Sequence, residues 1–504
     1  MTNVLEIERR RTRLEGDAAA VEAYFEKMNV DNDTILGSIQ RDSEGRLMNV
    51  FWADARSRAA FEDFGDVVTF DTTHLTNRYR MPFAPFVGVN HHGLSILLGC
   101  VLISYEDTDT FVWLFKCWLE CMGSLPGAIL TDQCKAIGKA VEIVFPQVRH
   151  RLCIWHILHN AAGNLDSHKK WEDIEKNMKI VVHDSLNLQE FEEAWALIVE
   201  KFALHDNVWI KDVYDIRRRW VPGYWRDSFW AGMSSSQRNE GLNLFFKGYM
   251  SLNSGLKQFI NLFEMALARK VEEEKSMNAN IMVRPHKCDK TILVEEVFHK
   301  AYSNSKFKEV QEEVHGLMHT NANKVTEDES LKIYEVTDKI VKLIWKAKRK
   351  NFIVNLNRTL GDFKCSCRLF EFRGILCNHI IQVLEIEEVD CIPEKYILDR
   401  RKNIVRNYEG IRIHYYDPSH SEKVKRFQGI TTINEYLTSL ALHNNATYTM
   451  FMEGTNELCK RLECTLGIHD KSGGSSLQCG EDKVYGRRRL QILEENERYI
   501  KKRK

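Results

Sequence analysis

The chain of 504 residues lacks several features that would fix its class at once. It has no uninterrupted apolar run near the roughly 18 residues that a membrane-spanning helix needs, so no transmembrane helix is predicted. It has only 8 prolines and 27 glycines, which argues against long fibrous or disordered tracts. The segment from Met1 to Arg13 is charged and lacks the apolar core of a secretory signal. Its formal net charge is zero, which disfavours contact with nucleic acid over the whole surface.

The composition that is present indicates a globular protein with a large core. Hydrophobic residues make up 44% and aromatic residues 10% of a chain long enough for two to four domains. The 13 cysteines begin at Cys100 and are mostly scattered singly in apolar surroundings. This pattern predicts buried thiols and one metal site in a reducing compartment, and it disfavours a disulfide framework.

Four residues of metal-binding type, three cysteines and one histidine, fall close together late in the chain. Cys365 and Cys367 form a Cys-x-Cys pair, and after nine further residues Cys377 and His379 form Cys-x-His. Three thiolates and one imidazole can close a tetrahedron around Zn²⁺, with no position left for a substrate. The spacing therefore predicts a structural zinc site, and a buried thiol cluster without metal is the alternative.

Three widely spaced carboxylates form a second candidate site. Asp71 ends an apolar strand that begins at Val67, Asp132 ends another over 128–132, and Glu240 lies on a helix predicted over 234–246. Such a set can hold two Mg²⁺ or Mn²⁺ ions for phosphoryl transfer on nucleic acids. The alternative makes Asp71 a turn residue, Asp132 a helix cap and Glu240 a solvated helix residue.

The order of predicted elements indicates a mixed sheet flanked by helices. A lead-in over 1–65 is predicted as a helix capped by Asp17, a hairpin and a second helix. Three adjacent strands then precede alternating helices and strands. Their predicted ranges are 67–71, 83–90 and 95–104 for the strands, then helix 110–122, strand 128–132, helix 133–141 and a strand from 148 that leads into a helix.

The second half is predicted to be mainly helical around one small β unit. Residues 165–235 are rich in tryptophan and read as a helical insertion, and helical patterning continues to about Ser276. A charged helical stretch is predicted from 293 to about 350, before a β unit over 352–380. Residues 471–476 are predicted to form a flexible linker.

Several short sequence motifs, in order over roughly residues 15–400, resemble those of the Mutator-like transposase domain. The closest resemblance is to the plant far-red-impaired-response and far-red-elongated-hypocotyl (FAR1-related) family, which is derived from such transposases. The motifs on which this resemblance rests are residues 49–58, 68–74, 81–93, 111–115, 130–133, 149–156, 236–240 and 392–396, together with the Cys-x-Cys…Cys-x-His module called SWIM.

The resemblance implies an RNase-H-like fold with a helical insertion before the glutamate. It implies that Asp71, Asp132 and Glu240 are the acidic triad, and that Cys153 and His156 match a Cys-x-x-His element of these transposases. Residues three apart on a helix share a face, so this pair could bind a metal or the nucleic-acid backbone; a core cysteine beside a half-buried histidine is the alternative. The expected domains are the lead-in 1–65, a transposase-like domain 66–275 with the insertion at about 165–235, a helical connector 290–350, a SWIM module 352–390 and a partly flexible extension 391–504.

The chain also departs from the family pattern. His74 stands where tyrosine is usual, Cys134 where an acidic residue is usual, and Gly241 where a serine follows the glutamate. None of these changes removes a carboxylate of the triad. We expect no counterpart of the zinc-chelating DNA-binding domain that is usual at the family's N-terminus.

Three functions remain open from the sequence. The first is a nuclear regulator of transcription without enzymatic activity, in far-red light signalling through phytochrome A, with DNA, other family members or transcription factors as partners and with homo- or heterodimers possible. The second is an active transposase with two metal ions at the triad, and the third is an interaction scaffold without DNA contact. Basic runs at 217–219, 346–350, 487–489 and 501–504 fit solvated surfaces, and the last two fit a nuclear-import signal.

Overall fold

The computed structural model describes residues 19, 21–24, 35–72, 77, 79–165, 168–185, 187–233, 241–242, 245–246, 255–283, 288–289, 291–328, 331–340, 348–402, 406, 408, 411, 430, 433–434, 436–438 and 440–465. The chain divides into two compact units. One comprises Met1–Met277 and Cys288–Asp417, and the other Asn278–Lys287 and Pro418–Lys504. Within the part that the structure describes, no helix is long and apolar enough to cross a lipid bilayer. Asp17, His74 and the predicted linker 471–476 lie outside the described residues.

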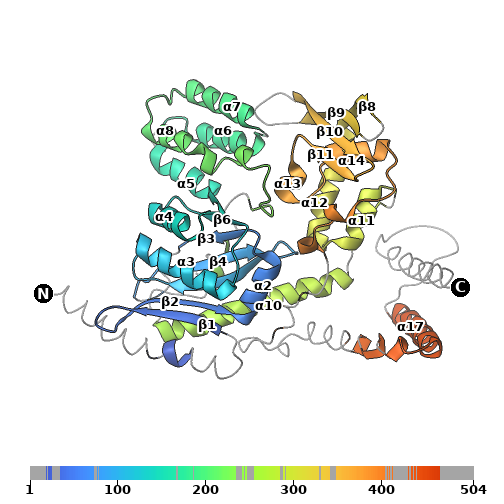
Figure 1. Ribbon diagram of the computed structural model, residues 1–504, viewed down its shortest axis with the longest axis horizontal. Coiled ribbons are helices and arrows are strands. Elements are labelled where there is room, and N and C mark those ends of the chain that lie inside the picture. The colour runs from blue at the N-terminus through green and yellow to red at the C-terminus, as the bar shows by residue number, and fades with distance from the viewer. Residues whose placement is uncertain are drawn as a thin grey trace. The chain divides into compact units, whose positions relative to one another are not determined.

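A seven-stranded mixed sheet forms the centre of the first unit (Figure 1). Its strand order is β1-β2-β5-β4-β3-β6-β7, with β3, β6 and β7 parallel to one another and the other neighbours antiparallel. The strands are β1 Ile35–Arg41, β2 Leu47–Asp54, β3 Val68–Phe70, β4 Phe83–Val89, β5 Ser95–Leu102, β6 Ala128–Thr131 and β7 Arg149–Leu152. The predicted mixed α/β sheet of RNase-H-like order is thereby confirmed.

The N-terminal hairpin belongs to this sheet, because β2 pairs with β5. Its turn forms where Asp42 Oδ1 accepts hydrogen bonds from the backbone N–H groups of Glu44 and Arg46, at 3.0 and 2.9 Å. Gly45 occupies the left-handed region at φ +77°, which a glycine adopts without steric cost.

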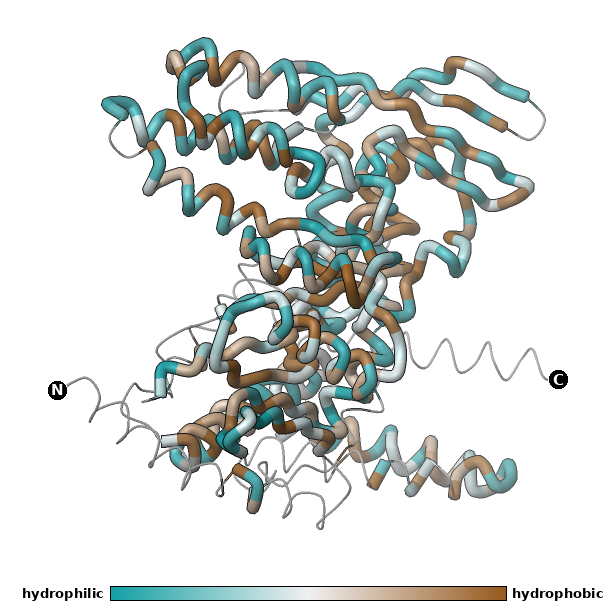
Figure 2. The backbone as a smooth tube through the Cα atoms, turned by 60° about the vertical axis from the view of Figure 1, so that its left-hand side comes forward, coloured by the Kyte–Doolittle hydropathy of each residue, from teal (hydrophilic) through white to brown (hydrophobic). Residues whose placement is uncertain are grey.

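Helices cover both faces of the sheet because side chains alternate along each strand. Phe51 of β2 packs with α2 (Ala55–Phe64), α3 (Thr108–Met122) and α4 (Lys135–Val144) on one face. Trp52, its neighbour, packs on the opposite face against Phe263 of α10 (Leu256–Val283). Figure 2 shows hydrophobic and hydrophilic stretches following one another along the backbone.

A helical insertion follows β7, as predicted for residues 165–235. Trp195 and Trp220 contact each other in its core, with ring centroids 6.1 Å apart. Its helices are α5 Ile154–Leu165, α6 Trp171–Asp184, α7 Leu188–Lys201, α8 Val208–Asp215 and the short 3-10 helices η1 Arg217–Arg219 and η2 Pro222–Tyr224.

The following module contains more strand than the sequence predicted. The predicted helical stretch over 293–350 is helical only in its first half, and residues from 320 onward form a four-stranded antiparallel sheet of order β11-β10-β9-β8. The module comprises α11 Leu293–Ala301, α12 Asn304–His315, η3 Gly316–His319, β8 Thr320–Glu327, β9 Leu331–Ile340, β10 Lys348–Asn357, β11 Asp362–Cys365, α13 Leu369–Arg373, α14 Asn378–Ile386, η4 Glu394–Tyr396 and η5 Asp399–Arg401.

The error has a physical reason. Tyr334 and Val336 of β9 are buried while Lys332, Glu335 and Lys339 between and beside them are not, which is the two-residue period of a strand. A high content of Lys and Glu suggested a solvated helix and hid this alternation.

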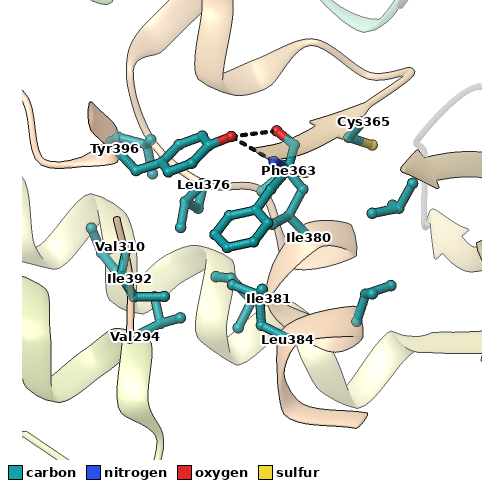
Figure 3. Packing of buried hydrophobic residues seen from close by; sticks show 14 of the residues in the cluster. Val294, Val310, Phe363, Cys365, Leu376, Ile380, Ile381, Leu384, Ile392 and Tyr396 are labelled. Atoms are coloured by element: carbon teal, nitrogen blue, oxygen red, sulfur yellow. Dashed lines mark hydrogen bonds between the residues drawn. The ribbon is translucent and has the colours of Figure 1, made fainter. Parts of the chain in front are cut away.

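The core of the module forms between its sheet and the helices α12 and α14 (Figure 3). Ile380 and Leu384 of α14 pack in this core with Phe363 of β11. The Tyr396 hydroxyl accepts a hydrogen bond from Phe363 N at 2.6 Å and donates one to Phe363 O at 3.0 Å. In the second unit the described structure is chiefly α17, Asn445–Thr465.

Candidate functional site

Asp71 and Asp132 follow the carboxyl ends of β3 and β6, two neighbouring inner strands of the seven-stranded sheet. Thr69 of β3 pairs with Leu130 of β6 in parallel register, and each aspartate follows two residues later. Asp71 is 5% exposed, whereas Asp132 is half-buried. The carboxyl ends of two parallel strands thus bring together two of the three predicted carboxylates, which are oxygen ligands of the type that Mg²⁺ and Mn²⁺ prefer.

His156 lies next to this pair. It sits in the first turn of α5, and its Nε2 is 3.7 Å from Asp71 Oδ2. Burial, with a smaller contribution from His159, lowers the pKa of His156 to about 4, so the imidazole is neutral at pH 7. The contact is therefore not an ion pair, and a neutral imidazole is the form that can ligate a metal.

Cys153, the partner predicted for His156, is fully buried where β7 ends. Its Sγ accepts a hydrogen bond from His156 N at 3.4 Å, as a cap at the start of the helix would. This contact accords with the core-cysteine alternative for Cys153, while the side chain of His156 extends toward Asp71.

The sequence reasoning missed Glu106, which follows β5. Its Oε1 accepts a hydrogen bond from Thr72 Oγ1 at 2.6 Å, next to Asp71. Burial raises the pKa of Asp132, and the negative charge of Glu106 adds to that rise. The only signal in the sequence was an acidic residue just before Asp107, the N-cap of α3.

A chain of hydrogen bonds supports Asp132 from the insertion. Arg219 Nη2 of η1 lies 3.3 Å from His150 Nδ1, and His150 Nε2 lies 2.8 Å from Thr131 Oγ1. Thr131 Oγ1 then donates to Asp132 O at 3.0 Å. Burial and the Arg219 charge lower the pKa of His150 to about 4, so this imidazole is neutral at pH 7 and can accept from the guanidinium. Glu240, the third predicted carboxylate, lies outside the described residues.

The second site gathers all four predicted zinc ligands. One ligand atom from each residue lies within 4.8 Å of the others, and all four residues are buried. Cys365 ends β11 and Cys367 follows it, while Cys377 precedes α14 and His379 lies in its first turn.

The spacing of the ligand atoms fits a tetrahedral zinc ion. Zn–S bonds of about 2.3 Å and Zn–N bonds of about 2.0 Å at tetrahedral angles place sulfur and nitrogen roughly 3.6 Å apart. Cys365 Sγ and His379 Nδ1 are 3.6 Å apart. Hydrogen bonds from Cys367 and Cys377 lower the pKa of Cys365 well below its usual value, which favours a thiolate there. The cluster supports a structural zinc site.

A carboxylate outside the ligand set lies beside the histidine. Asp338 Oδ2 of β9 is 3.4 Å from His379 Nε2, the ring nitrogen that faces away from the sulfur atoms, and 3.3 Å from Asn378 Nδ2. The ring of Phe352 stacks on the imidazole at 3.9 Å. Metal-bound histidines usually donate their second N–H to such a group, which fixes the ring orientation. Asp338 was not predicted from the sequence.

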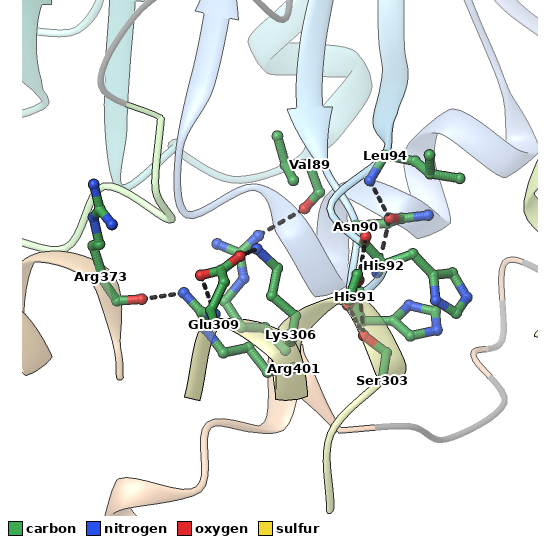
Figure 4. A network of polar contacts seen from close by, with 12 residues as sticks. Val89, Asn90, His91, His92, Leu94, Ser303, Lys306, Glu309, Arg373 and Arg401 are labelled. Carbon is green, nitrogen blue, oxygen red and sulfur yellow. Dashed lines mark hydrogen bonds and ion pairs between the residues drawn. The ribbon is translucent and has the colours of Figure 1, made fainter. Parts of the chain in front are cut away.

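Polar contacts join the transposase-type domain and the zinc module, which belong to one compact unit (Figure 4). Ser303, at the start of α12, donates to His91 O in the turn between β4 and β5 at 2.5 Å. Arg400 of η5 pairs with both carboxylate oxygens of Asp66, at 2.8 and 2.7 Å, and donates to Val89 O at 2.7 Å. Because Ser303 and Arg400 are largely withdrawn from water, separating the parts would leave their polar groups without partners.

Two family models match the chain at the two sites. A MULE transposase domain matches residues 67–160, which contain Asp71 and Asp132, and a SWIM zinc finger matches residues 358–386, which contain the four zinc-ligand candidates. Each model is matched where the structure gathers the corresponding side chains.

Curated relatives cover most of the chain. Protein FAR1-RELATED SEQUENCE 5 of Arabidopsis thaliana is 37% identical over 78% of this chain and 49% of its own length. Protein FAR-RED IMPAIRED RESPONSE 1 of the same plant is 35% identical over 77% of this chain and 46% of its own length. The chain therefore spans about half the length of these two relatives.

A third relative is matched over more of its own length. Protein FAR1-RELATED SEQUENCE 9, also of Arabidopsis thaliana, is 30% identical over 75% of this chain and 68% of its own length. From these relatives, the transposase-type domain and the SWIM zinc finger, we conclude that the chain belongs to the FAR1-related sequence family.

Proposed function

We propose that the protein is a nuclear regulator of transcription that uses a transposase frame and a zinc module as binding surfaces, not as a catalyst. Its place would be far-red light signalling through phytochrome A; the name of Protein FAR-RED IMPAIRED RESPONSE 1 links that relative to a far-red response. DNA, other family members and transcription factors are the proposed partners, with homo- or heterodimers among the assemblies.

The observation that carries this proposal is the shared, buried boundary between the transposase-type sheet and the zinc module. Trp230 N donates to Phe372 O at 3.0 Å, and Arg226 Nη1 donates to Cys367 O at 3.0 Å beside the zinc cluster. A zinc ion at Cys365, Cys367, Cys377 and His379 would then stabilise one continuous body. Fixed surfaces on such a body suit the recognition of partners.

A reporter assay in plant nuclei tests the regulatory role. Asp71→Asn removes the charge of the more buried of the two described triad carboxylates at nearly constant shape, and we expect reporter output to stay within about twofold. Cys367→Ser should abolish output by removing a zinc ligand, while Cys391→Ser, at an exposed cysteine of the same module, should not. Loss of output with Asp71→Asn at normal protein level would overturn the non-catalytic role.

An active transposase is the second candidate, favoured by the pairing of Asp71 and Asp132 beside the neutral imidazole of His156. Two Mg²⁺ or Mn²⁺ ions, held by these carboxylates and Glu240, would activate a nucleophile and stabilise the leaving oxygen. Incubation of the full chain with supercoiled plasmid and each ion tests this. Cleavage that is lost in Asp71→Asn but kept in Asp109→Asn, an exposed carboxylate of α3, would establish the enzyme.

A scaffold without DNA contact is the third candidate, which the zero net charge favours. Fluorescence anisotropy of the full chain with duplex DNA at increasing salt distinguishes it, because phosphate contacts make affinity fall with salt concentration. Absence of binding at 50 mM salt would favour the scaffold over the regulator that contacts DNA.

A further inference from the structure

One side of the transposase-type domain is strongly basic although the whole chain carries no net charge. It is formed by α4, by β7 at the edge of the sheet and by η1 of the insertion. These three elements contain seven Lys or Arg residues and one acidic residue, Glu142. The run Arg217–Arg219 is part of this surface.

Two of the seven cations are already used within the fold. Arg151 is buried and lies over the ring of Trp230, with its guanidinium carbon 5.4 Å from the ring centroid. Arg217 Nε pairs with Glu192 at 2.7 Å. The other five make no ion pair with any residue in the described ranges, and we call them the basic edge: Lys135, Lys139, Arg149, Arg218 and Arg219.

The basic edge is held together by packing, not by carboxylates. Gly138 of α4 has no side chain, and a Cβ built there would lie 3.6 Å from Arg219 Nη2, so the guanidinium lies directly against the helix. Arg219 also contacts His150 of β7. Arg219 thus lies against α4, which carries Lys135 and Lys139, and against β7, which begins at Arg149, and an anionic ligand would lower the mutual repulsion of these cations.

The basic edge also leads to the strand ends where Asp71 and Asp132 lie. Lys135 begins α4 three residues after Asp132, and Arg149 begins β7 after the helix has run back along the sheet. A helix of this length spans roughly 15 Å. Successive phosphates of one DNA strand advance about 3.4 Å along the axis of the duplex, so this span covers about four of them measured along that axis.

We propose that the basic edge binds the phosphate backbone of duplex DNA and directs one strand past Asp132. This inference rests on the proposed contact with DNA and assigns a surface to it. Duplex is favoured over single-stranded nucleic acid because the sequences of α4, β7 and η1 contain no Phe, Tyr or Trp on which unpaired bases would stack. It is favoured over a protein partner because aromatic anchors are also typical of protein interfaces.

The test compares two triple variants of equal charge change. The first is Lys135→Gln, Lys139→Gln and Arg149→Gln on the basic edge. The control is Lys169→Gln, Lys170→Gln and Lys176→Gln, three exposed lysines of the helical insertion. Anisotropy of a duplex of arbitrary sequence with the full chain gives Kd from 50 to 300 mM salt, with circular dichroism and zinc content as checks of folding.

Each lost phosphate contact should make the slope of log K against log salt less steep by about 0.9. The basic-edge variant is therefore expected to lose roughly 2.7 from the slope, and up to about 500-fold in affinity at 0.1 M salt if affinity at 1 M is unchanged. The control should change the slope by less than about 1.

The outcomes separate this inference from the proposed function. Equal slope changes in the two variants, or none in the basic-edge variant, would overturn the basic edge while the chain still binds DNA. If the unaltered chain does not bind DNA at any salt concentration, the proposed DNA contact fails and this inference fails with it. A wild-type complex displaced equally well by polyglutamate as by DNA would assign the surface to acidic proteins instead and overturn the duplex proposal.

Discussion

Replacement of Cys377 by serine is the sharpest test of the zinc site. Cys377 is 1% exposed, and its sulfur belongs to the group of ligand atoms that lie within 4.8 Å of one another. Serine keeps the shape but offers a neutral hydroxyl in place of a thiolate. Structural zinc sites bind with about 10–16 kcal/mol at pH 7. If four ligands contribute about equally, one is worth roughly 2.5–4 kcal/mol, which is about 10²- to 10³-fold in Kd.

The assay has three parts. Elemental analysis of the purified full chain is expected to find one zinc per chain in the wild type and much less in Cys377→Ser. Chelator competition gives the ratio of the two zinc affinities. Substitution by Co²⁺ reports the coordinating sulfurs through their charge-transfer absorption, which should weaken in the variant. Cys391→Ser is the matched control, because Cys391 is exposed and outside the cluster.

Two results would refute the reasoning. A wild-type chain purified without chelators that contains no zinc and binds none would remove the site altogether. A Cys377→Ser chain whose zinc affinity is within about threefold of the Cys391→Ser control would show that the Cys377 sulfur is not a ligand, whatever its position.

Asp338→Asn is expected to weaken zinc binding about 10- to 100-fold by chelator competition, and an unchanged affinity would show that Asp338 does not support the ligand. Burial alone would raise the pKa of Glu387, but hydrogen bonds from a lysine and a tyrosine outweigh it and lower the pKa to about 2. The stability that this carboxylate contributes is present above its unfolded pKa near 4.5 and is lost as pH falls toward 2. Glu387→Gln should therefore lower the free energy of unfolding by about 1–3 kcal/mol at pH 7, measured by hydrogen exchange of β9 and α14, and should make that free energy depend less on pH in acid. Glu388→Gln, at an exposed glutamate, should do neither. Gly374→Ala should destabilise the module by about 1–3 kcal/mol in thermal unfolding, because Gly374 has φ +70° and an added Cβ would clash with a leucine, while Gly454→Ala, in open space, should leave stability unchanged or slightly higher.

Part of the transposase-type sheet was predictable because two of its strands, β3 and β6, are short apolar runs that lead into a carboxylate. The run from Val67 to Asp71 and the run 128–132 each carry that signal locally, and parallel pairing then brings their ends together. The zinc ligands were predictable for a similar reason, since residue type and spacing are visible within fifteen positions.

What sequence reasoning missed depends on contacts between distant segments. Asp338 reaches His379 only because β9 pairs with β10 and the resulting sheet packs on α14. Glu106 reaches Thr72 only because β5 pairs with β4, which in turn pairs with β3. Neither residue stands out by type, burial or motif in the linear sequence.

The strands β8 and β9 were missed for another reason. One face of that sheet is polar, and its Lys and Glu residues are equally common on solvated helices. Only the burial of every second residue, such as Tyr334 and Val336, distinguishes a strand there.

The hairpin of β1 and β2 has a consequence for how far the transposase-type domain can be shortened. β5 receives hydrogen bonds from β2 on one side and from β4 on the other. A polypeptide trimmed to begin at residue 67, where the family match begins, would leave β5 as a bare border of unpaired amides and carbonyls. Such borders recruit strands from neighbouring molecules, so a minimal soluble fragment has to start upstream of Ile35.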